Sequence, residues 1–183
     1  MIGISRTPVR EAVIQLSEES RIIEIFPQRG MRIALIDVDL VEEARFLRLV
    51  LEKAAVELVC GEADEEDLQW LDENIRLPEF YLEGGSSRKL LELDNEMHRK
   101  LFSICRKELT YEMCQRLAIH YDRIRSLSVA AVKDHKIIED HKKLLEAIRS
   151  RDKKKAAETM DLHLNRWMMN EQMFRNQYPA YFK

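Results

Sequence analysis

The sequence has little glycine, proline and cysteine, and it has no long apolar run. Only 5 glycines and 4 prolines occur in 183 residues, too few turn-forming residues for a many-stranded β-sandwich or barrel. The 3 cysteines are odd in number and form no C-x-x-C pair, which argues against a disulfide framework and against a thiolate zinc site. The chain has no signal-peptide pattern and no apolar stretch near the roughly 20 residues of a membrane span. We therefore expect a cytoplasmic protein with no membrane partner.

The charge is nearly balanced, and much of it lies on residues that favour helices. The chain has 30 basic and 33 acidic side chains, a net charge of −3, and 45% of its residues are hydrophobic. This apolar content is ample for a buried core, and the length suits one full domain and part of another. Because Leu, Glu, Lys, Arg and Ala are abundant and turn-formers are few, we expect a mainly α-helical protein.

The first 36 residues have a pattern of their own. Thr7 and Pro8 are typical of the N-cap and first residue of a helix, and apolar residues at helical spacing extend it to about Glu19. Residues 21–26 and 31–35 are β-rich runs that a Pro-Gln-Arg-Gly turn joins, which predicts a hairpin. The N-terminal part is therefore expected to be one short helix followed by a β-hairpin.

From residue 37 onward the apolar residues recur at helical spacing almost throughout. Breaks are expected near Gly61, Gly84, Arg106, Lys133 and Ser150. The predicted helices cover residues 38–60, 64–83, 87–104, 108–132, 134–149 and 152–176. Each has an apolar stripe, so an antiparallel bundle around one core is expected. The chain thus divides into two domains, residues 1–36 and 37–183.

A helix followed directly by a hairpin is the order of parts in a winged helix-turn-helix, where a recognition helix precedes a wing. Helix N-termini and hydroxyl groups bind phosphate, and arginines one turn apart, here Arg6 and Arg10, reach guanine edges or phosphates. An arginine-bearing hairpin tip enters a minor groove. The alternative is a solvated helix with an ordinary hairpin, and spacing alone leaves both open.

The segment Ser-Arg-Thr-Pro-Val-Arg at residues 5–10, with Arg-Gly at residues 29–30, resembles the second half of the DNA-binding domain of GntR-family transcriptional regulators. The resemblance implies a recognition helix and a wing tip at these segments. It implies DNA contacts by Ser5, Arg6, Thr7, Arg10, Arg29 and Gly30. In that family one helix and most of a second precede the Gly3 turn, at which this sequence starts. Val13, Leu16 and Ile23 are therefore expected to be exposed or covered by a partner.

Four polar side chains fall where the helix stripes should be apolar. At 100° per residue, Asp94 and His98 lie one turn apart within the apolar arc of the same predicted helix. His141 also faces the core, and His163 lies nearer the edge of an apolar face. A buried, unpaired carboxylate is costly, so these groups need partners. A divalent cation bound by all four and a hydrogen-bond network of core histidines are the two alternatives.

The runs that contain these four residues, 94–102 and 140–163, resemble the FCD effector-binding domain of the FadR subfamily of GntR regulators. The resemblance covers about residues 37–177. It implies a divalent transition metal, zinc before nickel, manganese or iron, bound by Asp94, His98, His141 and His163. Because the acyl-CoA-responsive branch generally lacks this set, it also implies a small carboxylate effector, such as a hydroxy acid, keto acid or sugar acid.

Arg48 matches the arginine that the family has on the first bundle helix, where it would bind the effector carboxylate through paired hydrogen bonds. The alternative for Arg48 is an exposed ion pair with Glu52 one turn later. Arg123 and Arg125 are weaker candidates for the same task. His120 lies on the apolar face of its own helix, and we expect it to line the effector pocket or to be a satisfied core histidine.

These features predict a mainly α protein, an antiparallel bundle of six to seven helices preceded by a partial winged helix-turn-helix. The predicted function is that of a homodimeric, non-enzymatic transcriptional regulator, in which a metal and a carboxylate effector control binding to operator DNA. One alternative is a sensor and dimerisation module that does not bind DNA by itself. Another is a helical metallohydrolase, but no general base is evident, since Glu96 lies on the polar face opposite the histidines.

Overall fold

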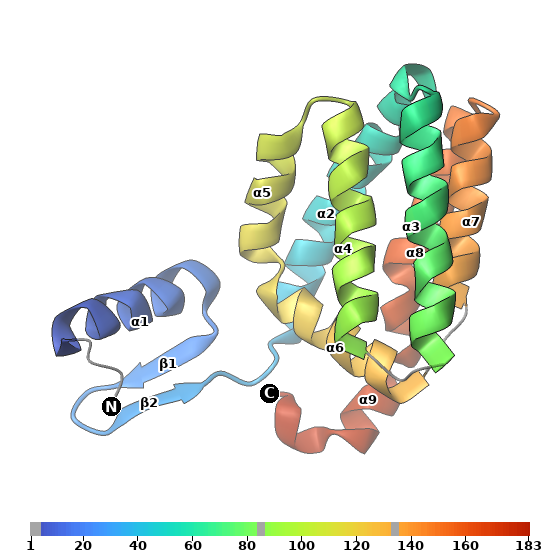
Figure 1. Cartoon of the computed structure of the whole chain (residues 1–183). Coiled ribbons are helices and arrows are strands. Elements are labelled where there is room, and N and C mark those ends of the chain that lie inside the picture. Colours follow the sequence, from blue (N-terminus) through green and yellow to red (C-terminus); the bar gives the residue numbers. More distant parts are fainter. Residues whose placement is uncertain (1–4, 84–86, 133–135) are drawn as a thin grey trace.

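The computed structural model of the chain describes residues 5–83, 87–132 and 136–183. Its N-terminal part consists of helix α1 (Arg6–Ser20) and an antiparallel pair of strands, β1 (Ile23–Phe26) and β2 (Gly30–Ile33). This part stands beside a bundle of helices, to which a short linker connects it (Figure 1). The predicted order of a helix, a hairpin and a helical bundle is therefore confirmed.

The N-terminal helix begins earlier than predicted. Ser5, not Thr7, has the extended backbone of the N-cap, and Arg6 is the first helical residue, since proline is tolerated throughout the first turn. The hairpin turn has positive φ angles at Gln28 (61°) and Gly30 (104°), of which the second is a conformation that favours glycine. No residue of α1 is buried, and Leu16 is 45% exposed.

The bundle contains more helices than predicted, because two of the predicted helices are interrupted. The elements are α2 (Val38–Glu62), α3 (Glu65–Glu83), α4 (Ser87–Ile104), α5 (Glu108–Leu117), α6 (Ile119–Val132), α7 (Lys136–Arg149), α8 (Lys153–Asn165) and α9 (Glu171–Gln177), with 3₁₀ turns at Arg166–Asn170 and Pro179–Tyr181. The predicted helix 108–132 is divided at Ala118, and the predicted helix 152–176 is divided after Asn165. The predicted breaks near Gly84 and Lys133 lie outside the described residues.

Local hydrogen bonds accompany both interruptions. At Ala118 the backbone N–H donates to Gln115 O at 3.2 Å, three residues back, instead of four as in an α-helix. At Asn165 the side-chain amide donates to Asp161 O at 2.8 Å, a local bond that competes with the backbone ladder. Neither position has the glycine or proline that would mark a break in the sequence.

The linker between hairpin and bundle is held by the C-terminal residues and by α6. Ile36 forms a parallel bridge with Phe182, in which Ile36 N–H donates to Tyr181 O at 2.7 Å. Arg123 Nη1 donates to the carbonyl oxygen of Ala34 at 2.7 Å. Ile36 and Phe182 belong to a small apolar cluster that also contains Tyr121 of α6. This cluster fixes where the chain enters the bundle.

Among the described residues, no helix has both the length and the apolar character that crossing a bilayer requires. The 3 cysteines, Cys60, Cys105 and Cys114, are buried and carry free thiols, as expected from their spacing. A larger apolar cluster contributed by α2, α3, α4, α5, α7 and α8 forms the core of the bundle. The polar residues described next lie beside this core.

Candidate metal and effector site

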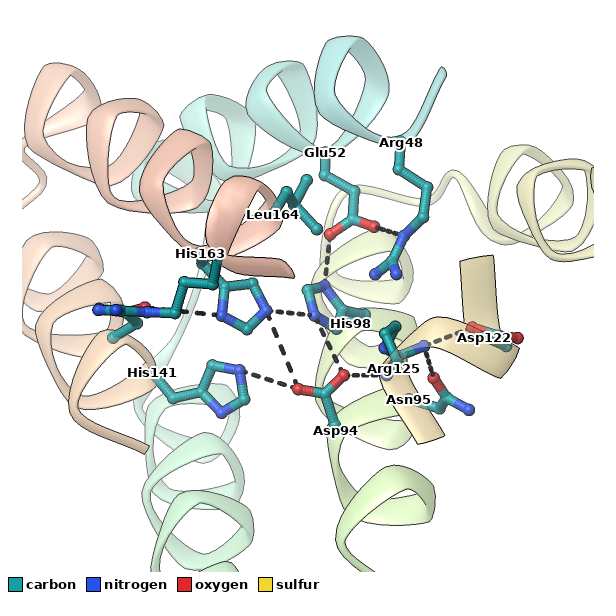
Figure 2. A network of polar contacts seen from close by, with 12 residues as sticks. Arg48, Glu52, Asp94, Asn95, His98, Asp122, Arg125, His141, His163 and Leu164 are labelled. Atoms are coloured by element: carbon teal, nitrogen blue, oxygen red, sulfur yellow. Dashed lines mark hydrogen bonds and ion pairs between the residues drawn. The ribbon is translucent and has the colours of Figure 1, made fainter. Parts of the chain in front are cut away.

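The four polar residues that interrupt the apolar stripes meet in the interior of the bundle. Asp94 and His98 come from α4, His141 from α7 and His163 from α8. One ligand atom of each can be chosen so that all four lie within 4.8 Å of one another. Figure 2 shows the three imidazoles arranged around the Asp94 carboxylate. Ligands about 2.0–2.2 Å from a common zinc ion lie within roughly this distance of each other, so the arrangement fits one metal ion.

All three histidines point Nε2 toward this cluster. His141 Nε2 lies 3.1 Å from Asp94 Oδ1, and His98 Nε2 lies 3.6 Å from Asp94 Oδ2. The Nε2 atoms of His98 and His163 face each other at 3.1 Å. Burial lowers the pKa of His98, and burial together with His141 lowers that of His163 well below its ordinary value. Neutral imidazoles are the form that binds metal, so both rings are in the state that a metal needs.

A buried carboxylate orients His98. Glu52 of α2 accepts a hydrogen bond from His98 Nδ1, which leaves the Nε2 lone pair of the neutral ring for the cluster. Although burial alone would raise the pKa of Glu52, Arg48 and His98 lower it to about 2. Sequence analysis gave Glu52 no role at the cluster.

Arg48 completes this chain of contacts. Its Nε donates to Glu52 Oε1 at 2.6 Å, so the ion pair considered for these residues is present. The alternative of an exposed pair is excluded, because Arg48 and Glu52 are 1% and 2% exposed. The Arg48 guanidinium stacks on Tyr121, 5.1 Å from the ring centroid. Its Nη1 and Nη2 are buried and have no hydrogen-bond partner among the described residues, so the N–H groups of both nitrogens remain for a ligand.

Two further arginines pair with carboxylates at the edge of the cluster. Arg125 of α6 contacts Asp94, which keeps the pKa of the Asp94 carboxyl well below its usual range although burial alone would raise it. Arg166, just after α8, binds both oxygens of Asp140. Asp140 Oδ2 in turn lies 4.0 Å from His163 Nδ1. Sequence analysis missed Asp140 and Arg166, although Asp140 directly precedes a candidate ligand.

A cavity of about 80 Å³ opens beside the cluster. Arg48, Asp94, His141 and His163 are among its lining residues, and Arg125 lines it as well. Helices α2, α3, α4, α6, α7 and α8 contribute to the wall. The polar groups expected to bind a metal and a carboxylate therefore border one common space.

The structure does not bring His120 to this cavity. His120 is 2% exposed and its Nδ1 accepts a hydrogen bond from the backbone N–H of Asp37 at 3.3 Å. It lines a different pocket, between the hairpin and the bundle, together with Ser17 and Lys183. Arg123 also points to the linker. His120 is therefore a linker contact, and its expected place in the effector pocket was wrong.

The residues expected to contact DNA are all exposed. Ser5, Arg6, Thr7 and Arg10 lie at the N-cap and in the first turns of α1, and Arg29 and Gly30 lie in the hairpin turn. A groove between the helix and the hairpin is lined by several of them, together with exposed apolar residues such as Val9 and Met31. Both segments thus present their polar groups on the N-terminal part of the chain.

Comparison with known proteins places the chain in a family. The sequence profile of the FCD domain matches residues 43–166. The chain is 27% identical to the HTH-type transcriptional repressor RspR of Escherichia coli over 181 residues, 98% of this chain and 79% of that protein. It is also 27% identical over 169 residues to YdhC of Bacillus subtilis, an uncharacterised HTH-type transcriptional regulator, which covers 89% of this chain and 73% of that protein.

Solved structures agree with this assignment. McbR/YncC of E. coli superposes with a TM-score of 0.80 at 20% identity, covering 96% of this chain and 87% of that chain. A GntR protein of Streptococcus agalactiae gives a TM-score of 0.55 at 26% identity, with coverages of 88% and 80%. The curated relatives are HTH-type transcriptional regulators, so the metallohydrolase alternative has no support among them. The chain is a member of the FCD-domain family of GntR-type regulators.

Proposed function

We propose that this chain is a ligand-responsive, DNA-binding transcriptional regulator, whose helical domain (residues 37–183) binds a divalent transition metal and a small carboxylate effector. The relatives named above are HTH-type regulators. The observation that carries the proposal is the convergence of Asp94 and three histidines next to the unpartnered guanidinium nitrogens of Arg48. An imidazole-rich set with one carboxylate binds transition metals.

Asp94, His98, His141 and His163 would hold the metal. Zinc suits this donor set, and nickel, manganese and iron are alternatives. When bound, the metal supplies a positive charge and a coordination position for a carboxylate oxygen. Glu52 supports the site by holding His98 in the tautomer whose Nε2 lone pair faces the cluster.

The effector carboxylate would bind between the metal and Arg48. The two free Nη groups of Arg48 form a planar fork that matches the two oxygens of a carboxylate. Since Arg48 is buried, leaving these donors without a partner is costly. A bound carboxylate removes that cost, which makes Arg48 the strongest candidate for effector recognition.

The N-terminal part, residues 1–36, would supply the DNA contacts. The exposed hydroxyls and arginines at the start of α1 suit phosphates and base edges, and the turn with Arg29 and Gly30 suits a wing. Because no residue of α1 is buried, a sensor and dimerisation module that does not bind DNA by itself is the second candidate.

Helix α6 is the physical connection between the two parts. Arg125 and Tyr121 line the cavity, whereas Arg123 and His120, on the same helix, hold the linker at Ala34 and Asp37. A ligand that favours one position of α6 would therefore shift the linker as well. Such coupling requires that the effector bind the two arrangements with different affinity.

A homodimer is supported by an exposed stripe on each of α2 and α5. Phe46 and Val50 of α2 are 62% and 50% exposed, and exposed Glu43 and Glu57 lie on the same face. The stripe on α5 is apolar, and it consists of Leu109, Met113 and Leu117. In a two-fold dimer, the apolar residues of the α2 stripe of one copy would face those of the α5 stripe of the other. Light scattering tests this contact: the mass in solution should be that of a dimer for the parent chain and that of a monomer for Phe46→Glu.

Metal analysis and DNA selection test the proposal. Elemental analysis of the purified chain and calorimetric titration with Zn²⁺ should give about one ion per chain. His141→Ala should abolish the binding, whereas His120→Ala, a buried histidine away from the cluster, should preserve it. Absence of Zn²⁺ binding would overturn the metal site.

Selection from random DNA duplexes should yield a sequence that the parent chain binds and the Arg6→Ala variant does not bind. A metal-binding chain that selects no duplex would be the sensor module.

A further inference from the structure

The cavity beside the ligand cluster has a polar end and an apolar end. The polar end consists of Arg48 and the residues proposed to bind the metal. On α4, Leu90 and Leu91 line the cavity one turn before Asp94, and on α7, Ile137 and Ile138 line it one turn before His141. On both helices, the apolar residues thus precede the proposed ligands by one turn.

Helices α4 and α7 run in the same direction, away from the end of the bundle at which α9 lies (Figure 1). Residues one turn before the ligands are therefore closer to that end on both helices. Pro78, in the last part of α3, lines the cavity too, and α3 runs toward the same end. The cavity consequently has its charged groups at one end and an aliphatic wall toward the other.

The charged groups leave hydrogen-bonding capacity for one carboxylate. Three arginines line the cavity, but Arg125 bonds to Asp94, Asp122 and Asn95, and Arg166 bonds to both oxygens of Asp140. Arg48 is the arginine whose buried nitrogens have no hydrogen-bond partner among the described residues. A second carboxylate on the ligand would have to displace one of these internal pairs.

The volume suits a short ligand. A water-sized group needs about 10–15 Å³ of such a cavity, so about 80 Å³ holds roughly five to eight non-hydrogen atoms. Butyrate has six and pentanoate seven. The hydroxyl of Ser128 is a further polar group of the wall, but the aliphatic side chains offer no partners for the several hydroxyls of a sugar acid.

We propose that the effector is a short aliphatic monocarboxylate, whose carboxylate binds at Arg48 and the metal and whose hydrocarbon part lies against Leu90, Leu91 and Ile137. The inference rests on the proposed function, since it assumes that this cavity is the effector site. It narrows the small carboxylates that the family resemblance implies, of which hydroxy, keto and sugar acids are examples, to acids with an apolar remainder. The aliphatic wall is the part of the site that selects among carboxylates.

Calorimetry with the full chain and Zn²⁺ tests this selection. The probes are acetate, propionate, butyrate and pentanoate. Lactate, with as many non-hydrogen atoms as butyrate, is the polar comparison, and succinate, with one more than pentanoate, is the doubly charged comparison. Burial of each methylene should tighten binding about fourfold. Butyrate should bind more tightly than lactate, and pentanoate more tightly than succinate. Ile137→Asn, or Leu91→Gln if that variant does not fold, should weaken pentanoate binding at least tenfold and leave acetate binding within twofold. Leu58→Ser, at an exposed position of α2, should change neither.

The outcomes separate the two levels of the proposal. If the acids bind in an Arg48-dependent manner but lactate or succinate binds more tightly than its aliphatic match, the inference is overturned and the proposed effector site stands. If lengthening the hydrocarbon chain gives no gain, the inference is overturned in the same way. If none of these acids binds, the inference is overturned as well. If Arg48→Met leaves the affinities unchanged, the proposed effector site itself is wrong.

Discussion

Glu52→Gln should destabilise the protein and weaken its metal site at the same time. Glu52 is 2% exposed and joins Arg48, which is 1% exposed, to His98, which is fully buried. Glutamine has nearly the same shape, so the substitution removes a charge without creating a cavity. It leaves the Arg48 guanidinium buried without its counter-ion, and it removes the strong acceptor of the His98 Nδ1–H.

The expected magnitudes follow from this geometry. Breaking a buried ion pair by removing one partner costs about 3–5 kcal/mol, and each kcal/mol lowers Tm by about 2–4 °C in a protein of this size. The metal-free variant should therefore melt about 6–20 °C below the parent chain. Loss of a carboxylate that orients a metal-binding histidine lowers metal affinity by about 10–100-fold, and we expect that loss for Zn²⁺.

Circular dichroism melts of the metal-free chain and calorimetric Zn²⁺ titrations measure the two effects separately. Glu62→Gln is the matched control, because Glu62 lies on the same helix but is exposed, and such surface changes usually stay within about 0.5 kcal/mol. A Glu52→Gln chain that melts within 1 °C of this control would refute the argument that the pair supports the fold. An unchanged Zn²⁺ affinity would refute the role of Glu52 in orienting His98.

Three other outcomes are expected. The folded-state pKa of Glu52 is about 2 and its ordinary value is 4.5, so its contribution to stability is complete above pH 4.5 and is lost as the pH falls toward 2. The free energy of urea unfolding should therefore depend less on pH between pH 5 and pH 2 in Glu52→Gln than in the parent chain. An equal pH dependence in the two chains would contradict the lowered pKa. Phe182→Ala should lower the free energy of urea unfolding by about 3–5 kcal/mol, since Phe182 is 6% exposed and packs against the linker. Tyr181 is 51% exposed, so Tyr181→Ala should lower it far less. Equal losses of unfolding free energy would contradict a linker role for the C-terminal residues. Burial raises the pKa of Cys114 to about 11, so a thiol reagent at pH 8 should label it only in denaturant, and rapid labelling of the native chain would contradict its burial.

Helical periodicity predicted the candidate ligands because each of them interrupts a pattern that is otherwise apolar. Asp94 and His98 lie one turn apart on an apolar face, and the structure brings them to His141 and His163, as the spacing and the resemblance suggested. Spacing along one helix fixes which residues share a face. It does not fix which helices meet, so the convergence of three helices depended on the family resemblance.

The same periodicity contained a signal that the interpretation of Arg48 did not use. Ala44, Arg48, Glu52 and Ala55 follow one another at steps of three or four residues, and all four are buried, which places the charged pair in the middle of an apolar stripe. An exposed ion pair is the commoner case for i, i+4 charges, which made it the alternative for Arg48. The apolar composition of the whole stripe indicates the burial of the pair better than the i, i+4 spacing of the two charges does.

The helix interruptions could not be found in this way. Ala118 is a good helix former by propensity, yet it ends α5 and precedes α6. Its complete burial indicates that tertiary contacts decide the local conformation there. The place of His120 was missed for a related reason: it lies on the buried side of α6, but the bundle and the linker each cover part of that side, and periodicity does not distinguish them.

The polar network in the core makes the arrangement of the bundle depend on one small site. Helices α2, α4, α6, α7 and α8 each contribute at least one charged or imidazole side chain to it. An apolar core tolerates small shifts between helices, but buried charges are compensated only when all their partners are in place. Even so, two nitrogens of Arg48 have no partner in the part of the chain that the structure describes, so the network of these residues is incomplete by itself. A metal and a carboxylate would complete it, and their binding would therefore favour one relative position of all five helices, including the helix that holds the linker.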